Sequence, residues 1–168
     1  MRSHHFRVCL TALAVALTTT MTGLAQQAQP AAPAQKAAVT PANARTSRFG
    51  VWDNSTNPNN VMTYELFDKD GSKLTVSNPS DPKSDWSYTT AFDGVFRPVT
   101  GQPGAETAVE IINPKSIRIY NKRDGVVNQV VINTLSDDLN TIHNEYIRMD
   151  KDGKITGVTH VDYIRRKK

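Results

Sequence analysis

Residues 126–165 read VVNQVVINTLSDDLNTIHNEYIRMDKDGKITGVTHVDYIR and carry the strongest structural signal in the chain. Three segments alternate apolar and polar residues: Val126–Thr134, Asn140–Met149 and Ile155–Arg165. Ser136-Asp137-Asp138 and Asp150-Lys151-Asp152-Gly153 separate them. Alternation with period two is typical of half-buried strands, and short Asp/Gly connections are typical of tight turns. The stretch therefore predicts three consecutive antiparallel strands.

The same pattern of short alternating segments and turns continues toward the N-terminus as far as residue 48. No segment in this region repeats apolar residues every 3.6 positions over a length sufficient for a core helix. Asp93-Gly94 is a strong hairpin signal between two of these segments. We therefore expect an all-β domain of about ten strands. The further predicted strands are Arg48–Asp53, Val61–Phe67, Lys73–Ser77, Trp86–Phe92, Val95–Val99, Ala105–Ile112 and Ser116–Asn121.

So many antiparallel strands in about 120 residues must cover their edges. A closed sheet or a two-sheet sandwich does this, and even spacing without long crossovers favours the closed sheet. The prediction is an antiparallel up-and-down barrel of about 8–10 strands. A barrel of this size is wide enough to hold one small ligand.

Residues 1–25 are predicted to be a signal peptide. Arg2 and Arg7 precede the apolar segment Val8–Leu17, and Gly23 and Ala25 are small residues suited to cleavage. The apolar segment is too short for a membrane anchor. We expect export to the periplasm or the extracellular space, with no stable membrane insertion of the mature chain.

Residues 26–47 are rich in Ala, Pro and Gln and are predicted to be a flexible tether. Residues 48–168 form the predicted barrel domain with a basic C-terminal tail, Arg165-Arg166-Lys167-Lys168, which we expect to be solvated. The net charge is +4, but residues 49–164 hold 11 Lys and Arg against 16 Asp and Glu. Because the basic charge lies at the ends, nucleic-acid binding is not expected.

Few reactive side chains remain in the predicted mature chain, which has no cysteine. The Asp-Lys-Asp-Gly segments lack the end ligands of a calcium loop. His143 and His160 could form a small site with Glu145 or Asp162, but two partly exposed strand histidines are the favoured explanation. Without a nucleophile motif or metal-ligand spacing, we expect no enzyme activity, no metal and no cofactor.

Several segments resemble small secreted lipocalin-like bacterial proteins of the calycin type, most of them without known function. Phe49-Gly50-Val51-Trp52 is similar to the Gly-x-Trp of the first calycin strand, and residues 92–103, FDGVFRPVTGQP, resemble the DGKxYPVTGxP segment of these proteins. The resemblance covers about residues 48–165. It implies a barrel with a cavity for an apolar or amphipathic molecule. Fatty-acid-binding calycins grip a carboxylate with Arg-x-Tyr, but here Val161 precedes Tyr163 at the arginine position.

The candidate ligand contacts are Trp86 and Tyr88, which follow a polar loop at residues 78–85 that could form a mouth, with Tyr64 and Phe96 as further aromatics. Arg118 and Tyr120 share one strand face. Either Ile117 and Ile119 point inward and Arg118 lies in solvent, or Arg118 lies in the lumen and neutralises an anionic head group.

The sequence therefore predicts an exported, non-catalytic, lipocalin-like barrel that binds a small apolar or amphipathic molecule. The alternative is a filled barrel that acts as an envelope-structural or protein-interaction module. A third reading is an enzyme whose site is assembled only by folding. The oligomeric state stays open.

Overall fold

The structure is a computed structural model that describes residues 44–167. Ten strands form one antiparallel sheet, and the helical segments in this range are two short 3-10 turns. The predicted all-β, up-and-down architecture is confirmed. The elements are η1 (Thr46–Arg48), β1 (Gly50–Asn54), β2 (Val61–Phe67), β3 (Gly71–Ser77), η2 (Pro82–Ser84), β4 (Trp86–Thr90), β5 (Arg97–Pro98), β6 (Ala105–Asn113), β7 (Ser116–Arg123), β8 (Val126–Leu135), β9 (Thr141–Met149) and β10 (Ile155–Arg165).

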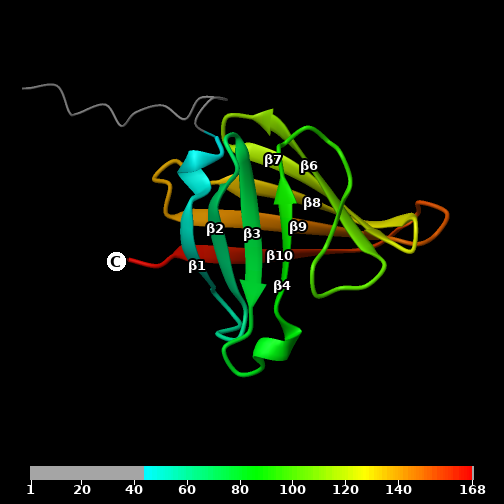
Figure 1. The fold of residues 1–168 in the computed structure, drawn as a ribbon, viewed down its shortest axis with the longest axis horizontal. Coiled ribbons are helices and arrows are strands. Elements are labelled where there is room, and N and C mark those ends of the chain that lie inside the picture. Colours follow the sequence, from blue (N-terminus) through cyan, green and yellow to red (C-terminus); the bar gives the residue numbers. More distant parts are fainter. Residues whose placement is uncertain (1–43, 168) are drawn as a thin grey trace, which may run out of the picture. The chain divides into compact units, whose positions relative to one another are not determined.

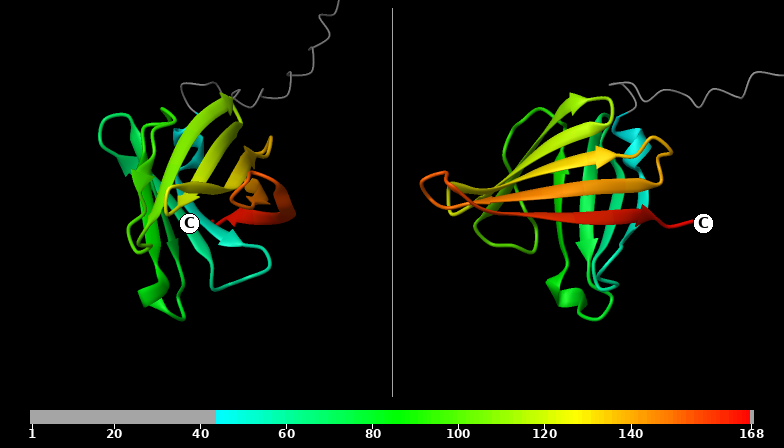
Figure 2. Two further views of the ribbon diagram at one scale, coloured as in Figure 1. Left: turned by 90° about the vertical axis from the view of Figure 1, so that its right-hand side faces the viewer. Right: turned by 180° about the vertical axis from the view of Figure 1, so that it is seen from behind.

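The sheet curls into a nearly closed barrel in the order β4-β3-β2-β1-β10-β9-β8-β7-β6-β5. Strands β1–β4 run across the direction of β6–β10, as two crossed layers (Figures 1 and 2). The seam lies between β4 and the segment after β5. It is closed by a pair of backbone hydrogen bonds between Ser87 and Thr100, of 3.0 and 2.8 Å.

The predicted hairpin at Asp93-Gly94 is wrong. β4 ends at Thr90, and the short β5 pairs with β6 instead of β4. Phe92 adopts a left-handed backbone with φ of 59°, and the Gly94 amide donates to the Val109 carbonyl. The chain therefore crosses the barrel seam at this point, and the Asp-Gly pair serves a wider turn.

The core follows the predicted alternation along the strands. Trp52, Ile117, Leu135 and Ile142 are at most 1% exposed and fill one end of the barrel. Strand β2 shows one exception, because Leu66 shares the inward face of Met62 and Tyr64 by alternation but is 63% exposed. β1 begins at Gly50 opposite Tyr64, so no β1 residue lies beside Leu66.

Candidate ligand-binding cavity

One end of the barrel is closed by Arg48, the last residue of η1. Its guanidinium is fully buried. It donates to Asn133 Oδ1 at 2.9 Å, to the Ala44 carbonyl at 2.7 Å and to the Lys115 carbonyl at 2.7 Å. The indole of Trp52 donates to the Arg48 carbonyl at 2.8 Å. Residues 44–47 therefore pack with the barrel, although the sequence places them in the tether, whose remainder lies outside the described residues.

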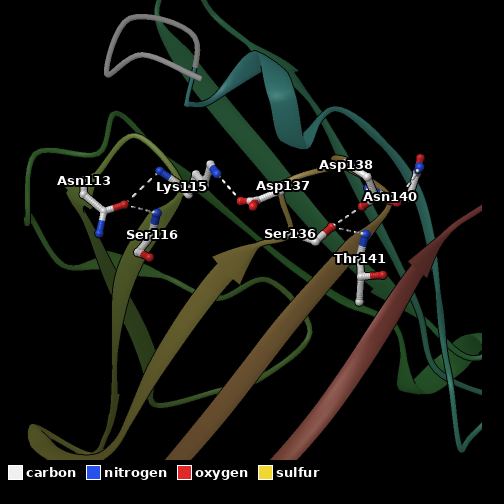
Figure 3. A network of polar contacts seen from close by, with 8 residues as sticks. All are labelled: Asn113, Lys115, Ser116, Ser136, Asp137, Asp138, Asn140 and Thr141. Carbon is white, nitrogen blue, oxygen red and sulfur yellow. Dashed lines mark hydrogen bonds and ion pairs between the residues drawn. The ribbon is translucent and has the colours of Figure 1, made fainter. Parts of the chain in front are cut away.

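The turns around this closed end hold the Lys115 carbonyl in place (Figure 3). Asn113 Oδ1 accepts hydrogen bonds from the backbone amides of Lys115 and Ser116, at 2.9 and 2.8 Å. The Lys115 ammonium pairs with Asp137 in the β8–β9 turn. The Lys115 carbonyl also accepts the Leu135 amide at 2.9 Å. Two adjacent turns thus present a fixed acceptor to Arg48.

Arg165 covers the outer side of Trp52, with its guanidinium carbon 4.0 Å from the ring centroid. It donates to the carbonyls of Leu139, Phe49 and Ser47 at 2.6–2.8 Å. The expectation of a solvated basic tail is therefore wrong for Arg165. The sequence could not show this, because three of these contacts, with Trp52, Phe49 and Ser47, join residues more than 100 positions apart.

Beyond the closed end lies a cavity of about 630 Å³. Its apolar wall is contributed mainly by β2, β3 and β4, and its polar wall by β7, β8 and β9. The apolar lining residues include Met62, Leu74, Val76, Trp86, Val99, Ile119, Val131 and Val161, and the polar ones include Thr107, Asn121, Gln129 and Asn144.

The two walls of the cavity differ in what they can do. Apolar side chains and aromatic rings can cover a hydrocarbon, whereas amides and hydroxyls can fix the position of a polar group. At the exposed end Lys122, Arg123 and Arg148 line the cavity together with the carboxylate of Glu106. The arrangement therefore suits a molecule with an apolar body and a polar or anionic group.

A chain of side-chain hydrogen bonds runs from Arg48 to the cavity wall. Asn133 donates through Nδ2 to Asn144 Oδ1 at 2.8 Å. Asn144 donates through Nδ2 to the Tyr146 hydroxyl at 3.0 Å. Burial raises the pKa of Tyr64 to about 12 and raises the pKa of Tyr88 and of Tyr146 as well. These hydroxyls therefore keep their protons at neutral pH.

Three predicted ligand contacts lie together in the cavity wall. Trp86, Tyr88 and Tyr64 all line it, and the rings of Trp86 and Tyr88 stack with centroids 6.3 Å apart. Trp86 and Tyr88 do not, however, lie beside a cavity opening formed by residues 78–85. Tyr88 is 4% exposed, and no residue of that loop lines the cavity. The exposed lining residues come from the β7–β8 and β9–β10 ends instead.

The other three predicted contacts, Phe96, Arg118 and Tyr120, are not among the residues that line the cavity. Alternation turns Ile117 and Ile119 inward, so Arg118 and Tyr120 lie on the outer face, where Arg118 Nε donates to Glu110 at 2.6 Å. The Arg118 guanidinium packs 5.2 Å from the Tyr120 ring. Of the two alternatives for Arg118, the lumenal position is therefore wrong, and the side chain lies on the outer face. Phe96 lies under the Lys122 ammonium, 3.7 Å from its ring centroid, outside the lining.

Sequence reasoning did not select Arg48, Asn133 or Asn144. A signal was present for the two asparagines, because period two places Asn133 between Val131 and Leu135, and Asn144 beside Ile142, on the inward face. A polar residue at an inward position points to a buried network. Arg48 offered no such signal. The predicted strand Arg48–Asp53 is wrong at its start, because Arg48 ends η1 and β1 begins at Gly50.

The two histidines lie on the outer face of β9 and β10. His143 Nδ1 is 2.8 Å from Asp162, and His160 Nδ1 is 3.8 Å from Glu145. Among residues 44–167 no group of three or more His, Cys, Asp or Glu side chains could hold a metal ion. In the same range, no helix has the length and apolar character needed to cross a membrane.

Comparison with solved structures finds the same barrel in the fluorescent protein UnaG. A substituted form of UnaG superposes with a TM-score of 0.52 at 13% identity, over 73% of this chain and 99% of UnaG. Wild-type UnaG gives a TM-score of 0.50 at 12% identity, over 70% and 96% of the two chains. The likeness is one of fold. It confirms the predicted calycin-like architecture.

No protein-family model matches the chain, and no curated protein matches it in sequence.

Proposed function

We propose that this chain is an exported, non-catalytic barrel that holds a small amphipathic molecule in its interior. The observation that carries the proposal is the cavity of about 630 Å³ lined by Trp86, Tyr88 and Tyr64. Small-molecule sites in proteins have volumes of roughly 300–1,000 Å³ and combine an apolar lining with a few polar groups. The alternative of a filled structural barrel is less favoured, because a filled barrel would leave no such space.

Export rests on residues 1–25, which lie outside the described part of the chain. The proposal expects a mature N-terminus near Gln26. N-terminal sequencing of protein from the periplasm or culture medium tests this part on its own. An intact Met1 in the membrane fraction would contradict it.

The binding site is tested by titrating the mature protein with fatty acids, retinoids and quinones. Tryptophan fluorescence reports contact, and calorimetry measures affinity independently of the fluorophores. Burial of an apolar body at roughly 25 cal/mol per Å², reduced by the entropy of association, predicts dissociation constants in the micromolar range.

Trp86→Ala removes the largest apolar surface of the cavity wall and should weaken binding about tenfold or more. Tyr120→Ala is the matched control, because it deletes an aromatic side chain of the outer face and should bind as wild type does. If no apolar compound binds below about 100 μM, or if Trp86→Ala binds normally, the alternative of a protein-interaction module that acts through its outer surface replaces this proposal.

A further inference from the structure

Among residues 44–167, the buried positive charge at the closed end of the barrel is not paired with an opposite charge. Arg48 is fully buried, and its partners are an amide oxygen and backbone carbonyls. No ion pair between described residues includes it. A buried charge is stabilised by hydrogen bonds or by an opposite charge. Here only the hydrogen bonds are supplied by residues 44–167.

The guanidinium sets the direction of the hydrogen bonds that lead away from it. Because Arg48 can only donate, Asn133 must present Oδ1 to it, which turns Asn133 Nδ2 toward Asn144 and toward the Tyr64 hydroxyl. Asn144 in turn presents Nδ2 to the Tyr146 hydroxyl, which accepts. The aligned amide dipoles extend the positive potential of Arg48 toward the cavity.

The series of hydrogen bonds that begins at Arg48 ends on tyrosine hydroxyls that line the cavity. Tyr146 accepts from Asn144, so its own hydrogen is available to another acceptor, either the neighbouring Tyr163 hydroxyl or a group inside the cavity. Tyr64 and Asn144 line the same region. Arg48 and Asn133 lie behind them and do not line it, so they act through these groups.

We propose that the cavity binds an amphipathic carboxylate with its carboxylate against Tyr146 and Tyr64, above the buried Arg48, and its hydrocarbon against Trp86. The inference rests on the proposed function and names the ligand class. Hydrogen bonds to a charged acceptor are stronger than neutral ones, and the uncompensated guanidinium favours a negative charge over a neutral polar group. The buried positive charge is that of Arg48, the last residue of η1.

The test uses calorimetry at pH 8 to compare dodecanoic acid with dodecan-1-ol. The two compounds have the same length of hydrocarbon chain and differ in the charge of the head group. Wild-type protein should bind the acid about tenfold more tightly than the alcohol. Tyr146→Phe removes one hydroxyl and should reduce this preference several-fold, because the acid loses a hydrogen bond to a charged acceptor whereas the alcohol loses a weaker neutral one. Tyr120→Phe is the matched control, because it removes a hydroxyl from the outer face and should keep the wild-type preference.

A second variant tests the charge itself. Asn133→Asp keeps the size of the side chain and gives Arg48 a carboxylate partner, so the preference for the acid should disappear while the alcohol still binds. If this variant does not fold, Tyr146→Phe decides the question alone. The two substitutions alter different residues of the same series of hydrogen bonds. If both reduce the preference for the acid, this series is the origin of the preference.

Three outcomes would overturn the inference. Equal binding of acid and alcohol to wild type removes the carboxylate preference but leaves the proposed function intact. Binding of neither compound, nor of any other apolar ligand, removes the proposed function as well. The third outcome is a preference for the acid that survives in both variants and falls steeply between 50 and 500 mM salt. That result would assign the preference to the exposed Lys122, Arg123 and Arg148 and not to the buried hydrogen bonds that begin at Arg48.

Discussion

At the scale of single residues, Arg165 and Arg166 are neighbours whose side chains lie in different surroundings. Arg165 stacks on Trp52 and donates to three backbone carbonyls, and partial burial lowers its pKa. Arg166 forms an exposed ion pair with Asp53, and hydrogen bonding to Arg166 lowers the pKa of that carboxyl. Exposed ion pairs contribute little to stability, whereas acceptors left without a donor inside the fold are destabilising.

Arg165→Gln should therefore lower the free energy of unfolding by about 2 kcal/mol, because the Trp52 stack and the carbonyl bonds are lost together. Arg166→Gln is the matched control and should unfold at nearly the wild-type urea concentration. Urea denaturation followed by circular dichroism measures both. Equal sensitivity of the two variants would show that Arg165 does not hold the closed end.

At the scale of the elements, the weak point of the barrel is the seam between β4 and the segment after β5. One pair of hydrogen bonds between Ser87 and Thr100 closes it. Gly101 follows directly, with φ of 85°, and a Cβ there would lie 2.4 Å from the Asp85 carbonyl oxygen. The close approach of the two segments thus requires glycine at this position.

Gly101→Ala should open the seam and lower the free energy of unfolding by about 1–3 kcal/mol, because both the positive φ and the backbone contact disfavour a side chain. Amide hydrogen exchange at Ser87 and Thr100 should accelerate. Gly157→Ala in β10 is the control, since a Cβ there meets nothing within 4 Å. Unchanged exchange in Gly101→Ala would contradict this account of the seam.

At the scale of the whole molecule, buried tyrosines should make the free energy of unfolding decrease as the pH becomes alkaline. Desolvation raises the pKa of Tyr64 to about 12 in the folded state, against about 10 in an unfolded chain. The unfolded state releases its proton first as pH rises. The stabilisation by the neutral hydroxyl is therefore complete below about pH 10 and is lost as pH rises through about 12.

The free energy of unfolding should accordingly fall between about pH 10 and pH 12, with a shallower decrease in Tyr64→Phe. Urea denaturation at each pH, with tyrosinate absorbance recorded in parallel, measures the effect. Tyr120→Phe is the comparison: burial also raises the pKa of Tyr120, but this outer-face residue is only half-buried, so the slope should change less than in Tyr64→Phe. The same slope in Tyr64→Phe and wild type would contradict the assignment to the buried hydroxyl.

Much of the fold could be predicted from the sequence, because strand signals are local. Alternation placed β2 and β10 at their observed bounds, Val61–Phe67 and Ile155–Arg165, and turned Ile117 and Ile119 inward. The prediction of a hairpin at Asp93-Gly94 is wrong, because an Asp-Gly pair indicates a turn without specifying which strands flank it. Pairing of β5 with β6 depends on how the whole sheet closes.

The sequence by itself determined that this chain forms antiparallel strands with Trp86, Tyr88 and Tyr64 on an inward face, because side-chain alternation is a property of each strand alone. Only the tertiary structure decided that Arg48 is buried at the closed end. It also decided that Arg48 meets Asn133, 85 residues away, and that a cavity remains beyond it. Neither follows from local pattern, since barrel closure brings distant residues together and side-chain volumes from all strands determine whether space is left inside.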